Sequence, residues 1–221
     1  MDYQRTLNRV ETYFDESATE VWARLTSDAP VSKIRQTVRA GRENMRLHLL
    51  SRLKQDVRGM RILDAGCGTG QLAIDLAKNG ADVTAIDISP ALVDIAQSRT
   101  PAHLIGKINF QSGDLRNVQG SFDAVVAMDS LIYYQQSDLL DVLDRLGSIS
   151  AQVLFTVAPR TPLLWLMWQS GKLFPREDRS PIMTPHAPNR LIQSWTGAGK
   201  MSDLGRISQM FYISHAMELS R

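Results

Sequence analysis

The chain of 221 residues contains a single cysteine, Cys67. One thiol cannot form an internal disulfide, and it excludes a metal site built from several thiolates. The sequence also lacks an uninterrupted apolar run of the ~20 residues that a membrane-spanning helix needs. Its first residues show no basic segment followed by an apolar one, so we expect no export signal and a cytoplasmic protein.

Aromatic residues are few, at 7% of the chain, and no basic stretch has aromatic residues interleaved with it. This pattern argues against a nucleic-acid partner. The net charge of +2 is small but unevenly distributed. Residues 33–61 hold nine Lys and Arg against two acids, whereas residues 62–159 hold five bases against eleven acids. Two interpretations stay open: an anionic ligand, membrane surface or acidic partner near the basic segment, or a solvated helix face.

Predicted strands and helices alternate after residue 55. Strands are expected at residues 60–65, 82–87, 107–112, 122–128 and 152–158, and helices at 71–79, 90–99, 138–146 and 186–195. Two further strands, near residues 200–208 and 210–219, close the chain. Strict alternation with short connections predicts an α/β fold, namely a doubly wound, Rossmann-like, seven-stranded and mostly parallel sheet.

A glycine-rich loop joins the first predicted strand to the first predicted helix of this sheet. It spans residues 64–70 and places glycines at every second position, Gly66, Gly68 and Gly70, with Cys67 between the first two. Glycines allow close approach of the backbone to a ligand, and a nucleotide ligand sits at this place in such sheets. A dehydrogenase fingerprint is excluded because the position that it reserves for Gly or Ala holds Gln71.

The form Asp64-x-Gly66-x-Gly68-x-Gly70 instead resembles motif I of class I S-adenosylmethionine methyltransferases. Asp87 ends the second strand, where a carboxylate can accept both hydroxyls of a ribose. The resemblance implies that Asp114, after the third strand, contacts the adenine, and that residues 122–126 form the strand after it. The donor-binding residues expected on this basis are Asp64, Gly66, Cys67, Gly68, Gly70, Asp87, Ile88, Asp114, Leu115 and Met128. No His or Asp is placed to activate Cys67, so we expect its thiol to pack rather than react.

The flanks of this core carry a more specific resemblance. Five segments of the chain carry it: Tyr13-Phe14-Asp15 with Trp22, the Ile34-Arg35-x3-Arg39-x-Gly41 stretch, the loop motif, residues 128–134, and residues 174–179. Together they resemble the magnesium-protoporphyrin IX O-methyltransferases of (bacterio)chlorophyll biosynthesis, from about Tyr13 to Glu218. The version in this chain looks most like those of purple phototrophic bacteria.

The resemblance divides the chain into four segments. Residues 1–55 would form an N-terminal helical lid, and residues 56–159 the Rossmann-like core that binds S-adenosylmethionine. Residues 160–185 would be a substrate-side insertion after the fifth strand, and residues 186–221 would complete the core. Tyr13, Arg35 and Arg39 lie in the lid segment, and we expect Tyr13 and Arg39 to close over the donor.

The implied reaction is methylation of one propionate carboxylate of the magnesium porphyrin, on the ring-13 side chain, giving a monomethyl ester. Tyr133 and Tyr134 would orient the acceptor, with no general base expected. Oxygenic members carry His where this chain has Tyr133, so no acid–base role is carried over to it. The resemblance also implies contact with the large porphyrin-binding subunit of magnesium chelatase and a peripheral membrane habit.

A porphyrin is a flat apolar disc with two carboxylates at one edge, so it needs an apolar slot and cationic anchors. Candidate acceptor-binding residues are the slot-forming Trp165 and Trp168, the anchors Arg176 and Arg179, and His186. Each has a plainer interpretation as well: core packing for the tryptophans, a solvated loop for the arginines, and an ordinary helix-start hydrogen bond for His186.

Two other functions fit the same residues. One is methylation of another small carboxylate, phenol or quinone, because this fold serves many acceptors. The other is a non-catalytic porphyrin-binding accessory protein. Retention of Asp64, Asp87 and Asp114 together argues against the second, because a decayed donor site would be free to lose them.

Overall fold

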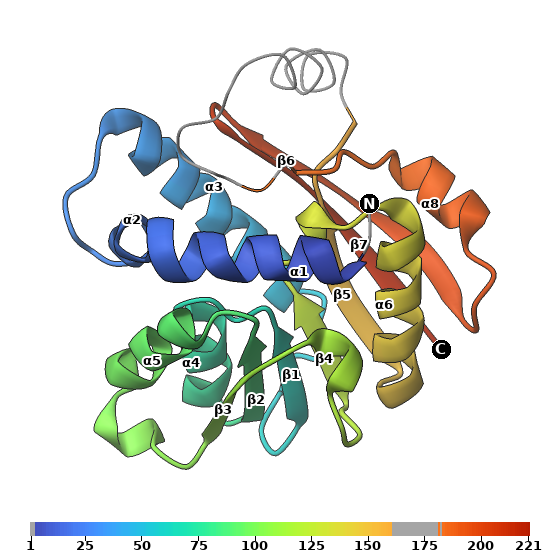
Figure 1. Ribbon diagram of the computed structural model, residues 1–221. Helices are drawn as coiled ribbons and strands as arrows, with labels where there is room; N and C mark the ends of the chain where they lie inside the picture. The colour runs from blue at the N-terminus through green and yellow to red at the C-terminus, as the bar shows by residue number, and fades with distance from the viewer. Residues whose placement is uncertain (1–2, 161–180, 182) are drawn as a thin grey trace.

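The computed structural model describes residues 3–160, 181 and 183–221. Its sheet has seven strands in the order β3-β2-β1-β4-β5-β7-β6 (Figure 1). The strands are β1 (Arg61–Ala65), β2 (Asp82–Asp87), β3 (Ile108–Ser112), β4 (Ala124–Ala127), β5 (Gln152–Val157), β6 (Lys200–Gln209) and β7 (Tyr212–Ser220). Only β7 pairs antiparallel with its neighbours, β5 and β6. The predicted seven-stranded, mostly parallel sheet is confirmed.

Helices cover both faces of this sheet (Figure 1). One face carries α3 (Lys33–Leu50), α4 (Gln71–Lys78) and α5 (Pro90–Arg99), and the other carries α6 (Gln136–Ile149) and α8 (Pro188–Ser194). The N-terminal segment before α3 folds as α1 (Tyr3–Thr12), a π-helical turn over Tyr13–Ser17, and α2 (Thr19–Leu25). The N-terminal helices predicted from the sequence are therefore present, and they are separate helices joined by turns.

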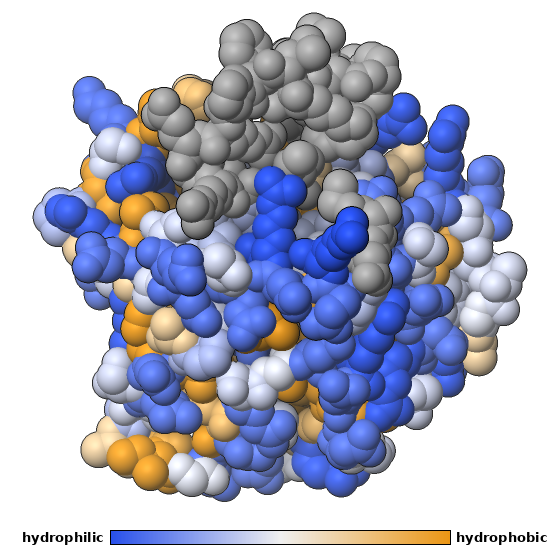
Figure 2. Space-filling model, in the orientation of Figure 1, coloured by the Kyte–Doolittle hydropathy of each residue, from blue (hydrophilic) through white to orange (hydrophobic). Residues whose placement is uncertain are grey.

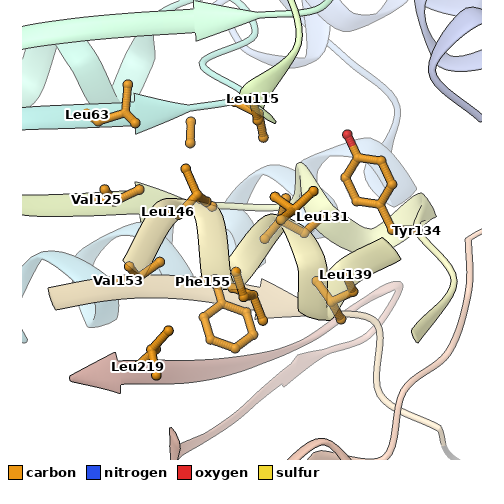
Figure 3. Packing of buried hydrophobic residues seen from close by; sticks show 14 of the residues in the cluster. Leu63, Leu115, Val125, Leu131, Tyr134, Leu139, Leu146, Val153, Phe155 and Leu219 are labelled. Carbon is orange, nitrogen blue, oxygen red and sulfur yellow. The ribbon is translucent and has the colours of Figure 1, made fainter. Parts of the chain in front are cut away.

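Strand residues alternate between two hydrophobic cores, because successive side chains of a strand point to opposite faces. Leu63 and Val125 pack with Leu139 of α6 in one core, which Figure 3 shows from close by. Ile62 and Val126 face the other way and pack with Met45 of α3. This two-sided burial explains why the central strands read as continuous apolar runs in the sequence.

Some element bounds differ from the sequence prediction. The strand expected at residues 122–128 covers only Ala124–Ala127, because Phe122 makes just an isolated bridge to Ser150. The helix expected at residues 138–146 is longer and spans Gln136–Ile149. The segment 160–185, predicted as an insertion, falls almost wholly outside the described residues.

Helix α3 packs against β7 at a glycine. A Cβ added to Gly41 would lie 2.6 Å from Cβ of Tyr212, a buried residue of β7. This distance is far below van der Waals contact, and the base of the tyrosine side chain cannot move without moving β7. The absence of a side chain at Gly41 therefore sets how closely α3 approaches the sheet.

Gly41→Ala is expected to destabilise the fold by about 1–3 kcal/mol, because an extra methyl group overpacks a tight contact. In a helix interior, alanine is normally more stable than glycine by about 1 kcal/mol. A loss of stability in this variant would therefore come from the packing contact and not from helix propensity. Urea denaturation measures it. Lys33→Ala, at an exposed position of the same helix, serves as the control and should change stability by no more than about 0.5 kcal/mol. A variant as stable as wild type would show that α3 can shift away from β7 at no cost.

Candidate functional site

The glycine loop lies between β1 and α4, as predicted, and its three glycines all have positive φ: 86° at Gly66, 52° at Gly68 and 80° at Gly70. A Cβ on Gly66 would lie 2.1 Å from Cβ of Ser130. The N–H groups of Gly66 and Cys67 donate to the carbonyl oxygen of Ile86 at the end of β2. The loop is therefore folded tightly against the neighbouring strand ends, with no room for a side chain at Gly66.

Asp87 ends β2 and fixes this loop from the other side. Its Oδ2 accepts a hydrogen bond from the Gly68 N–H at 2.8 Å, and its Oδ1 accepts from the Ser89 N–H at 3.0 Å. Burial raises the pKa of Asp87 above its usual value, while the Ser89 and Gly68 N–H groups lower it. Each carboxylate oxygen has a second lone pair, so the group can still accept hydrogen bonds from a ligand.

Asp64 ends β1 beneath the loop and is 2% exposed. Its Oδ2 has no hydrogen-bond partner in the structure as described. Burial, and next the charge of Asp87, raise the pKa of Asp64 to about 7. A buried carboxylate oxygen without a partner is costly and suits a cationic ligand group. The ammonium of the S-adenosylmethionine expected from the sequence would supply one, so the residues present fit that donor.

Asp114 follows β3, and its side chain holds the N-terminal helix. Its Oδ1 accepts hydrogen bonds from the Tyr3 hydroxyl and from the Arg116 N–H. The Tyr3 ring stacks on Tyr134 with centroids 5.4 Å apart, and the Arg116 guanidinium lies 3.4 Å from the centroid of Tyr3. Sequence reasoning missed Tyr3, because 111 residues separate it from Asp114 and no local pattern joins them.

These elements line one pocket at the carboxyl ends of the parallel strands, where ligands bind in open α/β sheets. Helix α1 and the turn after it contribute Val10 and Phe14 to the same pocket. Its lining includes these residues expected from the sequence: Arg39, Asp64, Gly66, Cys67, Gly68, Asp87, Ile88, Leu115, Met128, Tyr133 and Tyr134. Gly70, Asp114, Tyr13 and His186 do not line it, although Gly70 and Asp114 border residues that do.

The N-terminal residues expected over the donor have other contacts. Arg39 donates three hydrogen bonds to the carbonyl oxygens of Arg24, Leu25 and Ala29, at 2.9–3.0 Å, and so closes the end of α2. Tyr13 packs edge-on against Phe14 with centroids 5.1 Å apart, in a small apolar cluster beside the pocket. Their role as direct donor ligands stays a prediction.

Tyr133 and Tyr134 follow β4 and diverge. Tyr133 lies near Phe14, with ring centroids 6.3 Å apart, whereas Tyr134 is buried against Tyr3. Burial raises the pKa of both phenols well above the usual value. Both side chains therefore remain protonated hydroxyls at neutral pH. They can donate a hydrogen bond, but neither is poised to act as a base.

The remaining candidates are Cys67, His186 and the residues of the insertion. Burial raises the pKa of the Cys67 thiol, so it is not a nucleophilic thiolate. His186 is buried and its Nε2 lies 3.0 Å from the carbonyl oxygen of Tyr134, which is the plainer of the two interpretations. Burial lowers its pKa, which keeps the ring neutral. The other acceptor candidates lie outside the described residues: Trp165, Trp168, Arg176 and Arg179.

The structure adds a polar cluster that the sequence did not predict as a unit. Asp129, with the unusual φ of 56°, forms an ion pair with Arg42 of α3 at 2.5 Å. Its carboxylate also accepts hydrogen bonds from three hydroxyls, at 3.0–3.1 Å: Thr156 of β5 and Tyr212 and Ser214 of β7. Asp129 lies in the segment 128–134 singled out from the sequence, whereas Arg42 does not belong to any of those segments; their pairing spans 87 residues and leaves no periodic signal.

Comparison with known proteins agrees with this geometry. Residues 62–151 match a family model described as a methyltransferase domain, and residues 127–221 match one described as the C-terminus of magnesium-protoporphyrin IX methyltransferase. The magnesium-protoporphyrin O-methyltransferase of Rhodobacter capsulatus is 52% identical over 98% of this chain and 97% of its own.

More distant relatives extend the match. The chloroplastic magnesium protoporphyrin IX methyltransferase of Arabidopsis thaliana is 31% identical over 95% of this chain and 69% of its own. The crystal structure of the magnesium protoporphyrin IX methyltransferase of Synechocystis PCC 6803 with bound SAH superposes with a TM-score of 0.81 at 26% identity, covering 97% of this chain and 99% of that one. Because the Rhodobacter capsulatus enzyme matches nearly the whole chain at 52% identity, this chain belongs to the magnesium-protoporphyrin O-methyltransferase family.

Proposed function

We propose that this chain transfers the methyl group of S-adenosylmethionine to one propionate carboxylate of magnesium protoporphyrin IX, forming the monomethyl ester in bacteriochlorophyll biosynthesis. The observation that carries the proposal is identity of 52% with a protein named for this activity, over 98% of the chain. The acceptor side is included, because the C-terminal family model covers residues 127–221. A match of the donor-binding core alone would leave the acceptor open.

The donor would bind in the pocket along the glycine loop. Asp87 would accept the ribose hydroxyls, and the unpartnered oxygen of Asp64 would accept the ammonium of the methionine part. Gly113 and Leu115 line the adenine end of the pocket, beside Asp114. When bound, S-adenosylmethionine supplies a methyl group on a positively charged sulfur, which a nucleophile attacks in line.

The acceptor needs no base. A propionate has a pKa of about 4–5, as glutamate has, and is an anion at neutral pH. Its attack on the sulfonium cancels charge and moves no proton, so the protein contributes alignment and exclusion of water. Tyr133 remains protonated and would orient the acceptor by donating a hydrogen bond. Arg176 or Arg179 would hold the propionate that does not react, since a cation on the reacting one lowers its nucleophilicity.

A direct assay tests this function. Purified protein with methyl-labelled S-adenosylmethionine is expected to esterify magnesium protoporphyrin IX once, as followed by mass spectrometry. The dimethyl ester of the same porphyrin, which has no free carboxylate, is the control and should accept no label. Transfer to members of a quinone panel, with none to the porphyrin, would establish the alternative of a different small-molecule acceptor.

Tyr133→Phe is expected to lower kcat by about 10-fold, the worth of one hydrogen bond, rather than the ~10²–10⁴-fold of a lost general base. The kcat of both proteins, measured with saturating donor, should be flat from about pH 6.5 upward. Steady-state kinetics across this pH range check both statements. A loss beyond about 100-fold that higher pH restores would mean that proton abstraction matters and that the mechanism is wrong.

We also propose peripheral membrane contact and contact with the large subunit of magnesium chelatase, through the edge formed by α2, α3 and the β6–β7 turn. Five large apolar side chains are exposed on these elements: Val21, Ile34, Leu47, Met210 and Phe211. Figure 2 shows apolar residues gathered at the edge where α2 and α3 lie. None of the helices in the described parts of the chain is long and apolar enough to cross a membrane. Flotation with anionic vesicles tests the membrane part, and pull-down with the chelatase subunit tests the other.

A further inference from the structure

Arg42 is a cation of the pocket wall with unused binding capacity. Its Nη1 pairs with Asp129, and the guanidinium lies 4.7 Å from the ring centroid of Trp22, which also lines the pocket. Nε and Nη2 form no hydrogen bond with any residue that the structure describes. The side chain is only 18% exposed, so these donors have little access to bulk water.

The two other arginines of the pocket wall are more fully engaged. Arg39 uses its Nε and Nη2 on three backbone carbonyls. Arg46 lies within ion-pair distance of Asp75 through Nε, at 3.0 Å, and of Glu43 through Nη2, at 2.6 Å, although its buried Nε forms no hydrogen bond with the described residues. Arg39 and Arg46 thus each direct two guanidinium nitrogens at protein groups. Arg42 directs only Nη1, and its Nε and Nη2 have neither an ion-pair nor a hydrogen-bond partner among the described residues.

Arg42 is also held in a fixed orientation. Asp129 is itself anchored by the hydroxyls of Thr156, Tyr212 and Ser214, and these hydrogen bonds draw charge from its carboxylate. Stacking on Trp22 fixes the plane of the guanidinium and contributes a cation–π attraction. A planar guanidinium with two adjacent free donors matches the geometry of a carboxylate.

From these contacts we infer that Arg42 binds a carboxylate group inside the pocket, with Asp129 as the positioning residue that aims it. The inference rests on the proposed function for the identity of its ligands. Two groups of that reaction carry a carboxylate: the methionine part of the donor and a propionate of the acceptor. Arg42 can serve either group, because it lines the same pocket as Asp64 of β1 and Tyr133 after β4.

The test compares Arg42→Met with wild type on matched probes that differ by one carboxylate. For the donor, titration calorimetry uses S-adenosylhomocysteine and its decarboxylated analogue, which keeps the ammonium. For the acceptor, fluorescence quenching uses magnesium protoporphyrin IX and its dimethyl ester. Arg35→Met is the matched control, because it removes an arginine at an exposed position of the same helix that is not among the described residues lining the pocket.

Arg42→Met is expected to lower the affinity for one carboxylate-bearing probe by about 10–50-fold, and the affinity for its carboxylate-free partner by less than 2-fold. A selective loss with S-adenosylhomocysteine identifies the donor carboxylate, and a selective loss with the porphyrin diacid identifies the propionate. Arg35→Met should leave the affinity for all four probes within about 2-fold of wild type. Arg42→Lys keeps the positive charge and loses the paired N–H donors of the guanidinium, so it should show the same selectivity with a smaller loss of affinity. This variant replaces Arg42→Met in the test if the methionine variant is unstable.

Equal losses of affinity for the two probes of each pair, or no loss of affinity for any probe, would overturn the inference. Arg42 would then serve only in its structural ion pair with Asp129. Failure of the proposed function can be distinguished from failure of this inference. In that case wild-type protein would not esterify magnesium protoporphyrin IX, but the two donor probes would still show whether Arg42 binds the donor carboxylate.

Discussion

Asp87→Ala is expected to weaken binding of S-adenosylmethionine by about 30–150-fold, equivalent to about 2–3 kcal/mol. Asp87 is buried at the end of β2, beside the glycine loop, and lines the pocket. Removal of the carboxylate leaves both ribose hydroxyls without an acceptor in a site that excludes water. The N–H groups of Gly68 and Ser89 lose their acceptor as well, so the loop is less well fixed before the donor arrives.

Titration calorimetry with S-adenosylhomocysteine measures the effect on binding. Asp82→Ala is the matched control, because Asp82 begins the same strand, is exposed, and pairs only with Lys107 among the described residues. It should leave affinity within about 2-fold of wild type. Thermal melting of both variants shows whether a loss of donor affinity is local to the site or follows from a folding defect. Equal affinity of Asp87→Ala and wild type would remove Asp87 from the donor site.

The strands and the donor loop could be predicted from the sequence because their signals are local. Buried parallel strands are short apolar runs, and the spacing of Gly66, Gly68 and Gly70 identifies the loop between β1 and α4. Strand ends were less predictable, since Phe122 is as apolar as the residues of β4 but lies outside its ladder.

The acceptor side of the pocket was harder to predict because its contacts join distant segments. Arg39 and Arg42 lie one turn apart on α3, yet Arg39 caps α2 whereas Arg42 pairs with Asp129. Both residues are arginines of the same helix, so neither residue type nor helical periodicity distinguishes them in the sequence. Their different roles depend on where α2 ends and on how closely α3 approaches β7 at Gly41, which are properties of tertiary packing.

The orphaned oxygen of Asp64 gives the last prediction, which concerns stability and pH. The pKa of Asp64 is raised by burial to about 7 in the folded protein, against the ordinary value of 3.8. Between these two values the unfolded chain has lost the proton and the folded protein retains it, so stability falls as pH rises. Above about pH 7 both states are ionised and the full penalty is present.

Asp64→Asn removes this titration. Between pH 4 and pH 8, the stability of the ligand-free variant relative to wild type is expected to shift in its favour by about 2–4 kcal/mol. Urea denaturation at several pH values measures the shift. The absolute stabilities include the cost of burying an amide, so the slope with pH is the diagnostic quantity. Identical slopes for the two proteins would show that Asp64 ionises normally.

Donor binding should respond in the opposite direction, and this links the stability cost to function. An ammonium placed against the Asp64 carboxylate favours its ionised form, so donor binding expels a proton below about pH 7 and tightens as pH rises toward that value. Asp64→Asn should therefore bind S-adenosylhomocysteine more weakly at pH 8, by about 10-fold or more, with little dependence on pH. Methylthioadenosine lacks the ammonium and should bind both proteins alike. If binding of methylthioadenosine is weakened in the variant too, Asp64 acts by shaping the glycine loop rather than by pairing with the ammonium of the donor.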